Sequence, residues 1–404
     1  MTPTTERPKE RLEALTSMRF LAAALVVVFH IFHQAPVMQR LPRLLRSGIE
    51  SGYVWVGFFF ILSGFILAYQ YGSRVVTAGF DLRDFWLARF ARIYPGFLLG
   101  FLMVAGLLSV KVWDGGYPPG GGAGMTADLL ATLGLVHAWV PSFAITFNFP
   151  SWSVSVEAFF YLLFPLLALA SARLSLRRFL GLAGLLYLAS VAGHLAYCAV
   201  TPFGWLGNDW VHDSGRHFIK FFPLVHLPEF ILGMAMGRLY GARRHLGLTE
   251  TVGRRLARIA GILVLAGLCV SDRIPLALMH NVALALPFAA LILGLALAPA
   301  TSFGAWLSHP IPVALGDASY SLYILQVPVI WLFVQKVEWT NATSLPFAFC
   351  YRAAILAAIT LLALVSHRFL ETPARIWLRA AGRRWWRKDR GTPERPGSEG
   401  IQVA

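Results

Sequence analysis

Long apolar segments separated by short polar connections make up most of this chain, and most basic residues lie in the connections. A helix needs about 20 apolar residues to cross a hydrocarbon core about 30 Å thick, and most of these segments approach that length. The pattern therefore predicts an all-α fold, a polytopic membrane helix bundle. We place eleven apolar segments, at residues 17–34, 52–70, 88–110, 127–146, 151–171, 178–200, 220–240, 256–271, 281–299, 314–335 and 346–368.

The basic loops indicate which side of the membrane each connection faces, because lysine and arginine favour the cytoplasmic side. Five regions are rich in them: the N-terminus, the loops after the second, fifth and seventh segments, and the C-terminal tail. These regions share one side only if the weakly apolar segment 127–146 does not cross, so we expect that segment to be re-entrant or peripheral. About ten transmembrane helices then remain, with both termini cytoplasmic. Arg40, Arg43 and Arg46 oppose this topology, since they would lie outside.

The composition agrees with an integral membrane protein. The chain is 57% hydrophobic and 14% charged, with a mean hydropathy of +0.62, whereas soluble domains carry about 25% charged residues. The net charge of +15 does not indicate nucleic acid, because the basic residues lie between apolar segments and at the end. No metal-binding or nucleotide-binding motif occurs. We divide the chain into a cytoplasmic N-terminal tail (1–11), a membrane domain (12–376) and a basic, disordered cytoplasmic tail (377–404).

The first apolar segment contains two ionisable side chains, Arg19 and His30. His30 lies eleven residues after Arg19, about 16 Å along a helix axis, which places an imidazole near the middle of the bilayer. An ionisable group at that depth indicates function, and histidine is the side chain best suited to proton transfer near neutral pH. The alternative is a histidine satisfied by a neighbouring helix, which is how we interpret His33.

A second polar group is the sequence RFARIYP at residues 89–95. Arg89 and Arg92 are three residues apart, so both project from the same face of a helix entering the membrane. The Tyr94-Pro95 step predicts a kink or helix start that would present the arginines to a cavity. Arginine suits bidentate contacts with phosphate, although ordinary anchoring at the cytoplasmic face is the alternative.

A third group follows residue 149. Glu157 lies in an apolar segment and must be paired or protonated there, with Arg19 as a possible partner. The alternative is a helix-cap carboxylate near the interface, and Trp152 and Ser153 would begin this helix. Further along the chain, the pair His226 and Glu229, three residues apart, either lines a cavity or satisfies itself.

Seven motifs now occur in a recognisable order: the Arg19 and His30 pair, FFFILSGFIL (58–67), RFARIYP (89–95), WSVSVEAFFYLLFP (152–165), LPEFILGM (227–234), LGDASYSLYILQVPV (315–329) and SHRFLETPAR (366–375). Together they resemble the acyltransferase-3 family of integral membrane O-acyltransferases, over about residues 12 to 376. The resemblance implies a ten-helix domain of the bacterial cytoplasmic membrane. Such a domain moves an acyl group, often acetyl, from cytoplasmic acyl-CoA to a hydroxyl of a glycan, lipid-linked sugar, exopolysaccharide or secondary metabolite.

The resemblance also implies roles for particular residues. His30 matches the catalytic histidine, Arg19 its partner and Glu157 the acidic residue, while Arg89 and Arg92, with Tyr94 beside them, match the donor-binding pair. Acyl-CoA, in the first place acetyl-CoA, is then a substrate, and we expect no permanently bound cofactor and no metal.

The chain departs from the family pattern at four positions. Thr16 and Ser17 stand where members often carry Asp and Gly, and Ala158 stands where a second carboxylate often follows the first. Gln326 replaces a histidine and cannot titrate. We also expect no appended hydrolase domain after the last helix.

Two other classes of protein remain open at this stage. A polytopic transporter would also carry polar residues at mid-membrane, but it should show an internal inverted repeat, and none is evident. A non-catalytic subunit that recognises or flips a glycan would bind through the same residues. The expected partners are the acyl-CoA donor, the hydroxyl acceptor and the lipid bilayer, and not nucleic acid.

The topology can be checked with reporter fusions. A reporter at Gly122 should be active on the outer side, and one placed after Arg379 should be active in the cytoplasm, because the five basic regions share that side. Reporters on the same side at both positions would contradict ten crossings.

Overall fold

A computed structural model describes residues 11–33, 35–76, 80–113, 123–201, 214–299, 301–341 and 344–389, and it contains helices and no strand within these ranges. The α-helices are α1 (Glu13–Phe32), α2 (Arg43–Glu50), α3 (Trp55–Tyr71), α4 (Leu82–Trp113), α5 (Ala123–Leu133), α6 (Trp152–Ala172), α7 (Leu176–Val200), α8 (Ser214–Phe221), α9 (Leu227–Gly241), α10 (Glu250–Cys269), α11 (Leu276–Asn281), α12 (Ala285–Leu297), α13 (Ser302–Leu307), α14 (Pro310–Asp317), α15 (Ser319–Asn341), α16 (Leu345–Ser366) and α17 (Thr372–Asp389). A π-helical turn, His367–Glu371, joins the last two.

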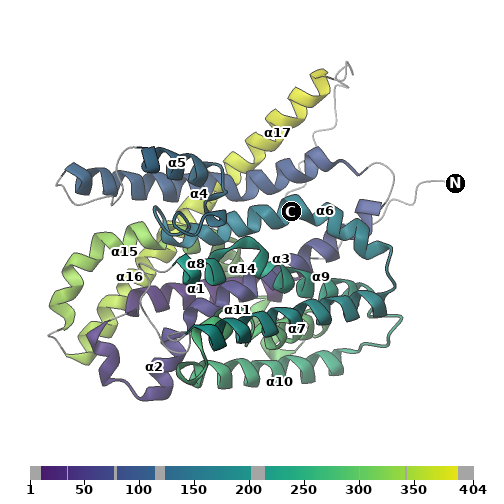
Figure 1. Cartoon of the computed structure of the whole chain (residues 1–404), viewed down its shortest axis with the longest axis horizontal. Coiled ribbons are helices and arrows are strands. Elements are labelled where there is room, and N and C mark those ends of the chain that lie inside the picture. The colour runs from purple at the N-terminus through teal and green to yellow at the C-terminus, as the bar shows by residue number, and fades with distance from the viewer. Residues whose placement is uncertain are drawn as a thin grey trace.

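The long helices form one bundle (Figure 1). Most of them run along the horizontal direction of the view, with α1 and α3 in the middle, α10 along the bottom and α4 along the top. The helices α15 and α16 lie together at the left, and α17 projects at the upper right. The tail expected from residue 377 thus begins inside α17, whereas residues 390–404 lie outside the described residues.

Several helices have the length and composition of membrane spans. Within the described residues seven qualify, or up to nine if each of two bent helix pairs counts as one span. The chain is therefore a multi-pass membrane protein, as predicted. The count of ten stays a prediction.

Close contact between α3 and α9 fixes the middle of the bundle. A Cβ atom on Gly64 would lie 2.1 Å from the carbonyl oxygen of Phe230, and one on Gly233 would lie 1.9 Å from that of Ile61. Only glycine allows the two backbones to approach this closely, which is how small residues bring membrane helices together. The contact also holds the start of α9 against α3, where a Cβ on Gly57 would meet the Glu229 carboxylate.

The segment 127–146 does not form a spanning helix. Helix α5 has 11 residues and so extends about 16 Å, roughly half the thickness of a hydrocarbon core. The chain then reverses at Leu135, whose φ of 56° lies in the left-handed region, and continues through a short 3₁₀ turn, His137–Trp139. This agrees with the expectation of a re-entrant or peripheral segment.

A proline in α15 explains how the end of that segment is anchored. Pro328 has no N–H, so the carbonyl oxygen of Ile324, four residues earlier, lacks its helical donor. Asn148 Nδ2 donates to that oxygen at 2.9 Å, and the Asn148 side chain is buried. Gly100 on α4 lies against both groups, since a Cβ there would be 2.9 Å from Asn148 Nδ2.

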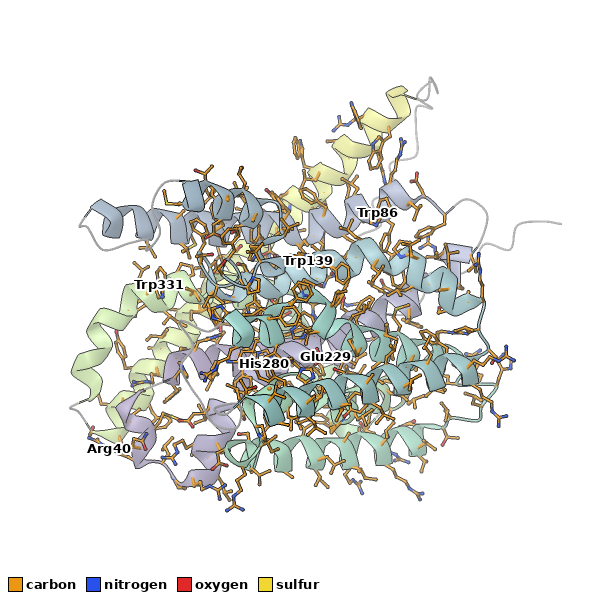
Figure 2. The ribbon with its side chains drawn as sticks, viewed as in Figure 1. Arg40, Trp86, Trp139, Glu229, His280 and Trp331 are labelled. Atoms are coloured by element: carbon orange, nitrogen blue, oxygen red, sulfur yellow. The ribbon has the colours of Figure 1, made fainter. Side chains whose placement is uncertain are left out.

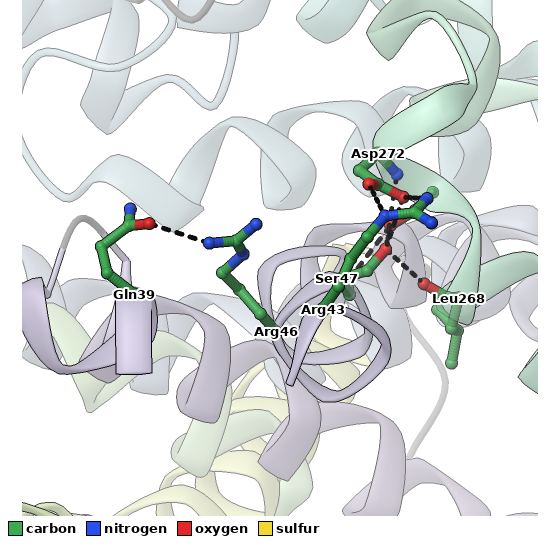
Figure 3. Close-up of polar contacts among 7 residues, drawn as sticks. Gln39, Arg43, Arg46, Ser47, Leu268 and Asp272 are labelled. Carbon is green, nitrogen blue, oxygen red and sulfur yellow. Dashed lines mark hydrogen bonds and ion pairs between the residues drawn. The ribbon is translucent and has the colours of Figure 1, made fainter. Parts of the chain in front are cut away.

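The arginines that oppose the predicted topology have partners on their own side of the bundle. Figure 3 shows Arg43 donating to both carboxylate oxygens of Asp272, at 2.7 and 2.8 Å, and Arg46 donating to Gln39 at 2.8 Å. The hydrogen bonds from Arg43 hold the pKa of the Asp272 carboxyl below its usual value. The contacts with Asp272 and Gln39 hold two of these arginines in place, but they leave the objection to the topology as it was, because the rule counts lysine and arginine and not net charge.

The contact between Asn148 and Ile324 makes a stability prediction. Asn148→Leu should lower the free energy of unfolding by about 1–3 kcal/mol, because a buried carbonyl loses its donor. In a Pro328→Ala background the helix supplies its own N–H, so the same substitution should cost much less. Thermal unfolding in detergent measures both differences, and an equal loss in the two backgrounds would contradict the explanation.

Candidate active site

Two pockets lie at different heights along α1. The first, which we call the arginine pocket, has a volume of about 50 Å³ and is lined by residues that include Arg19, Arg92, Asp317, Tyr320, Glu371 and Arg375. The second, the histidine pocket, has a volume of about 20 Å³ and is lined by residues that include His30, Tyr53, Phe149, Trp152, His280 and Tyr323. The first apolar segment thus contributes Arg19 to one pocket and His30 to the other.

The arginine pocket is assembled from distant parts of the chain. Arg92 comes from α4, Asp317 from the end of α14, Glu371 from the π-helical turn and Arg375 from α17. Three guanidinium groups face two carboxylates, so the lining carries an excess of positive charge. Ser321 donates to the Glu371 carboxylate and so fixes one of the two acidic groups. Arginines in this arrangement suit an anionic ligand such as a phosphate.

Glu157 belongs to the same electrostatic cluster. Tyr161 Oη donates to its carboxylate, and the carboxylate interacts electrostatically with Arg19 and Arg92. The hydrogen bond that the structure gives the Glu157 carboxylate is the one from Tyr161, and its partnership with Arg19 stays a prediction. One helical turn earlier on α6, Ser153 Oγ hydrogen-bonds Tyr323 Oη at 2.8 Å, beside the histidine pocket. Helix α6 thus contributes to the surroundings of both pockets.

Arg89 and Arg92 lie in different environments although they are one turn apart. The Arg89 guanidinium lies 5.4 Å from the Tyr71 ring centroid and 5.8 Å from that of Tyr161, and it donates to Tyr71 Oη at 3.2 Å. Arg89 is not part of the lining of either pocket. Tyr94 donates to the Leu133 carbonyl at 3.3 Å, so it connects α4 to the end of α5.

The proton on His30 can be placed from its hydrogen bonds. His30 Nδ1 lies 2.9 Å from Gln326 Oε1, and Gln326 Nε2 donates to the Tyr323 carbonyl at 2.8 Å. The second contact fixes the orientation of the amide, so Oε1 faces His30 and can only accept. His30 Nδ1 therefore carries the proton, and the lone pair of the neutral ring is on Nε2. That nitrogen is the one available as a base or nucleophile.

His226 and Glu229 satisfy each other rather than line a pocket. His226 Nδ1 lies 2.9 Å from the Glu229 carboxylate, and His226 Nε2 lies 2.7 Å from the Lys220 carbonyl oxygen. Both side chains are buried, and Figure 2 shows Glu229 in the interior of the bundle. Of the two residues expected to begin α6, which are also candidate site residues, Trp152 lines the histidine pocket and Ser153 hydrogen-bonds Tyr323 of its wall.

Sequence reasoning missed several residues of these pockets. His280 lines the histidine pocket from the short helix α11, and Arg375 and Glu371 reach the arginine pocket from the last motif. A His-Asn pair at the edge of an apolar segment was the available signal for His280. Within the described residues, no group of three or more His, Cys, Asp or Glu side chains could hold a metal ion.

A helical membrane protein that places a cationic pocket and a neutral histidine along the same helix has the parts of a membrane-embedded group-transfer enzyme. Residues 12–366 match the family described as acyltransferase domain, so the chain belongs to the acyltransferase-3 family and is an O-acyltransferase. This assignment decides against the transporter and the non-catalytic subunit.

Named relatives agree with the family assignment. The chain is 29% identical over 394 residues to acyltransferase MdmB of Streptomyces mycarofaciens, an alignment that covers 93% of each protein. It is 25% identical over 381 residues to O-acetyltransferase OatA of Staphylococcus aureus and 23% identical over 401 residues to peptidoglycan O-acetyltransferase OatA of Listeria monocytogenes. These alignments cover 90% and 93% of this chain but 57% of each OatA protein. No solved structure matches.

The hydrogen bond from His30 to Gln326 makes a spectroscopic prediction. In protein with ¹⁵N-labelled histidine, the His30 signals should show a protonated Nδ1 and an unprotonated Nε2. Gln326→Leu removes the acceptor at Nδ1, so His30 should populate both tautomers. A His30 spectrum that is the same in wild type and variant would show that Gln326 does not set the tautomer.

Proposed function

We propose that the protein transfers an acyl group, in the first place acetyl, from acyl-CoA in the arginine pocket to a hydroxyl acceptor in the histidine pocket. The observation that carries the proposal is the pairing of the two pockets along α1 and α15. Arg19 and His30 lie on α1, and Tyr320 and Tyr323 of α15 line the arginine and histidine pockets respectively. An elongated donor with phosphates at one end and a thioester at the other matches this arrangement.

The proposed orientation places the arginine pocket at the cytoplasmic face of a bacterial membrane. Arg11, beside the N-terminal end of α1, pairs with Asp317 of this pocket at 2.6 Å, and α17 contributes Arg375. Both lie next to regions whose basic residues favour the cytoplasm. Helix α10 would be the tenth crossing. It has 20 residues and packs against α12, and the arginines in its first turns would lie at the membrane surface. The histidine pocket then lies toward the outer face.

Arg92, Arg19 and Arg375 would hold the donor phosphates. Of the two arginines expected to do so, Arg92 lines the pocket, whereas Arg89 lies against the rings of Tyr71 and Tyr161. Arg89 then supports the pocket by holding α4 against its neighbours. Glu157 would balance the charge of Arg19 and Arg92 when the pocket is empty.

The chemistry would take place at His30 Nε2. In direct transfer, this nitrogen accepts the proton of the acceptor hydroxyl while the hydroxyl oxygen forms a bond to the thioester carbon. The C–S bond then breaks, and the proton passes from His30 to the CoA thiolate. In the covalent alternative, Nε2 attacks the thioester carbon, the C–S bond breaks and CoA leaves as the thiolate; the acceptor oxygen then takes the acyl group from Nε2, and the hydroxyl proton passes to the thiolate. Both routes need the lone pair on Nε2, which the hydrogen bond of Nδ1 to Gln326 favours.

The acceptor would be a hydroxyl of a glycan, a lipid-linked sugar, an exopolysaccharide or a secondary metabolite. Two of the relatives are named O-acetyltransferases, one of them for peptidoglycan, which supports an acetyl group and a hydroxyl acceptor. This chain spans 57% of the length of each of them.

The proposal is tested with purified protein, radiolabelled acetyl-CoA and a panel of hydroxyl acceptors. His30→Ala should bind the donor as wild type does but transfer about 10²–10⁴-fold more slowly, or not at all if His30 carries the acyl group. Arg92→Ala should weaken donor binding at least about tenfold, because an arginine–phosphate contact contributes about 1.5–3 kcal/mol.

Arg89→Ala is the matched control for the donor site. It removes the same charge one helical turn away, but outside the pocket, so donor binding should fall less than in Arg92→Ala. Equal losses in the two variants would argue against Arg92 as the direct contact. Unaltered transfer by His30→Ala would place the base elsewhere, with Glu157 the next residue to test.

A further inference from the structure

The histidine pocket contains a second imidazole, that of His280. The side chain is 6% exposed and lines the same pocket as His30. Its neighbour Asn281 is also buried, and the two side chains are hydrogen-bonded, with His280 Nδ1 at 2.5 Å from Asn281 Oδ1. Figure 2 shows His280 in the interior of the bundle.

Two backbone carbonyls, those of Ser190 and Ile219, determine which nitrogen atoms of His194, Asn281 and His280 donate hydrogen bonds to one another. The Ser190 carbonyl can only accept, so His194 Nδ1, at 2.7 Å, carries a proton and His194 Nε2 carries the lone pair. Asn281 Nδ2 therefore donates to His194 Nε2 at 2.8 Å, and it also donates to the Ile219 carbonyl at 2.6 Å. The amide oxygen of Asn281 must then face His280, whose Nδ1 is the donor.

The two histidines of the pocket are consequently in the same state. In each, Nδ1 donates to a side-chain amide oxygen, from Gln326 for His30 and from Asn281 for His280. In each, the neutral ring has its lone pair on Nε2. A ligand that bonds to both Nε2 atoms needs two donors. His226 cannot accept a hydrogen bond from a ligand in the same way, because both of its nitrogen atoms already face oxygen atoms of the protein.

Most of the remaining lining is aromatic. The Tyr53 ring stacks on His280 with centroids 5.4 Å apart, and the Trp152 ring centroid lies 5.9 Å from that of His280. The pocket volume of about 20 Å³ has room for one or two hydroxyl-sized groups and not for a whole sugar ring. A ligand would therefore insert an edge with its hydroxyls while its apolar surface contacts the rings.

We propose that His280 is an acceptor-binding residue that accepts a hydrogen bond from a second hydroxyl of the acceptor, next to the hydroxyl that His30 deprotonates. The substrate class is then a compound with neighbouring hydroxyls on an otherwise apolar ring edge, as in carbohydrates, rather than a simple alcohol. This inference rests on the proposed acyl transfer and specifies its acceptor.

The test uses two acceptors that differ by one hydroxyl, cyclohexanol and trans-cyclohexane-1,2-diol, with acetyl-CoA as donor. The diol has two hydroxyls that can be acylated, so kcat/KM is divided by the number of hydroxyls in each acceptor. The resulting value for wild type should be about tenfold higher for the diol than for cyclohexanol, as expected for one additional hydrogen bond. His280→Ala should lose that preference, so that the ratio of kcat/KM for the diol to kcat/KM for cyclohexanol falls by about tenfold. His280→Gln retains an accepting oxygen and should keep part of the preference.

His245→Ala, which removes an exposed histidine, is the control and should keep the full preference. A His280→Ala enzyme that still favours the diol would overturn the proposal, as would a wild type that transfers equally to both.

A titration of ¹⁵N-histidine-labelled protein with the same two probes does not need turnover. The diol should shift the His280 Nε2 signal and cyclohexanol should not, and the absence of a shift with the diol would overturn the proposal even if neither probe is acetylated. Failure of acetyl transfer to every hydroxyl acceptor, by contrast, would count against the proposed function.

Discussion

A polar group in the interior of a membrane bundle has no water to bind and must find its partner within the chain. In this protein that constraint fixes the orientation of the buried amides, and the amides then fix the histidines. Gln326 is held by a carbonyl of its own helix and Asn281 by the Ile219 carbonyl, and each presents its oxygen to a histidine. The protonation pattern of the histidine pocket therefore follows from backbone carbonyls that take no part in chemistry.

The same helices serve two kinds of electrostatic environment. Arginines and carboxylates gather at one level of α1, where Arg92, Arg375 and Glu371 meet Arg19. Neutral imidazoles and aromatic rings gather at the other level, around His30. Charged groups are less costly near the interface than at the bilayer centre, and neutral ones are tolerated deeper. Depth along α1 thus separates a region suited to binding an anion from a region suited to proton transfer.

The sequence predicted the parts of the structure that depend on local composition. Apolar length located the long helices, and two ionisable residues in one apolar segment identified Arg19 and His30. The sequence did not predict contacts between distant residues. Nothing near Arg89 in the sequence shows that the Tyr161 ring lies beside it, and nothing near His30 shows that its hydrogen-bond partner is Gln326. His280 was missed for the same reason, since its place in the pocket depends on contacts with Tyr53, just before α3, and with Trp152 at the start of α6. The family resemblance supplied roles, but Gln326 departs from the histidine that members carry at its position, and His280 lies outside the seven motifs.

The bond between Asn148 and Ile324 has a consequence for biogenesis. A ribosome makes Asn148 long before α15, so the irregular segment that contains Asn148 enters the membrane region without its final partner. Ile324 likewise leaves the ribosome with a carbonyl that its own helix cannot satisfy. The hydrogen bond from Asn148 to the Ile324 carbonyl can therefore form only once α15 has been inserted. The wall of the histidine pocket formed by Phe149 and Trp152 therefore acquires this anchoring contact only after α15 has been made.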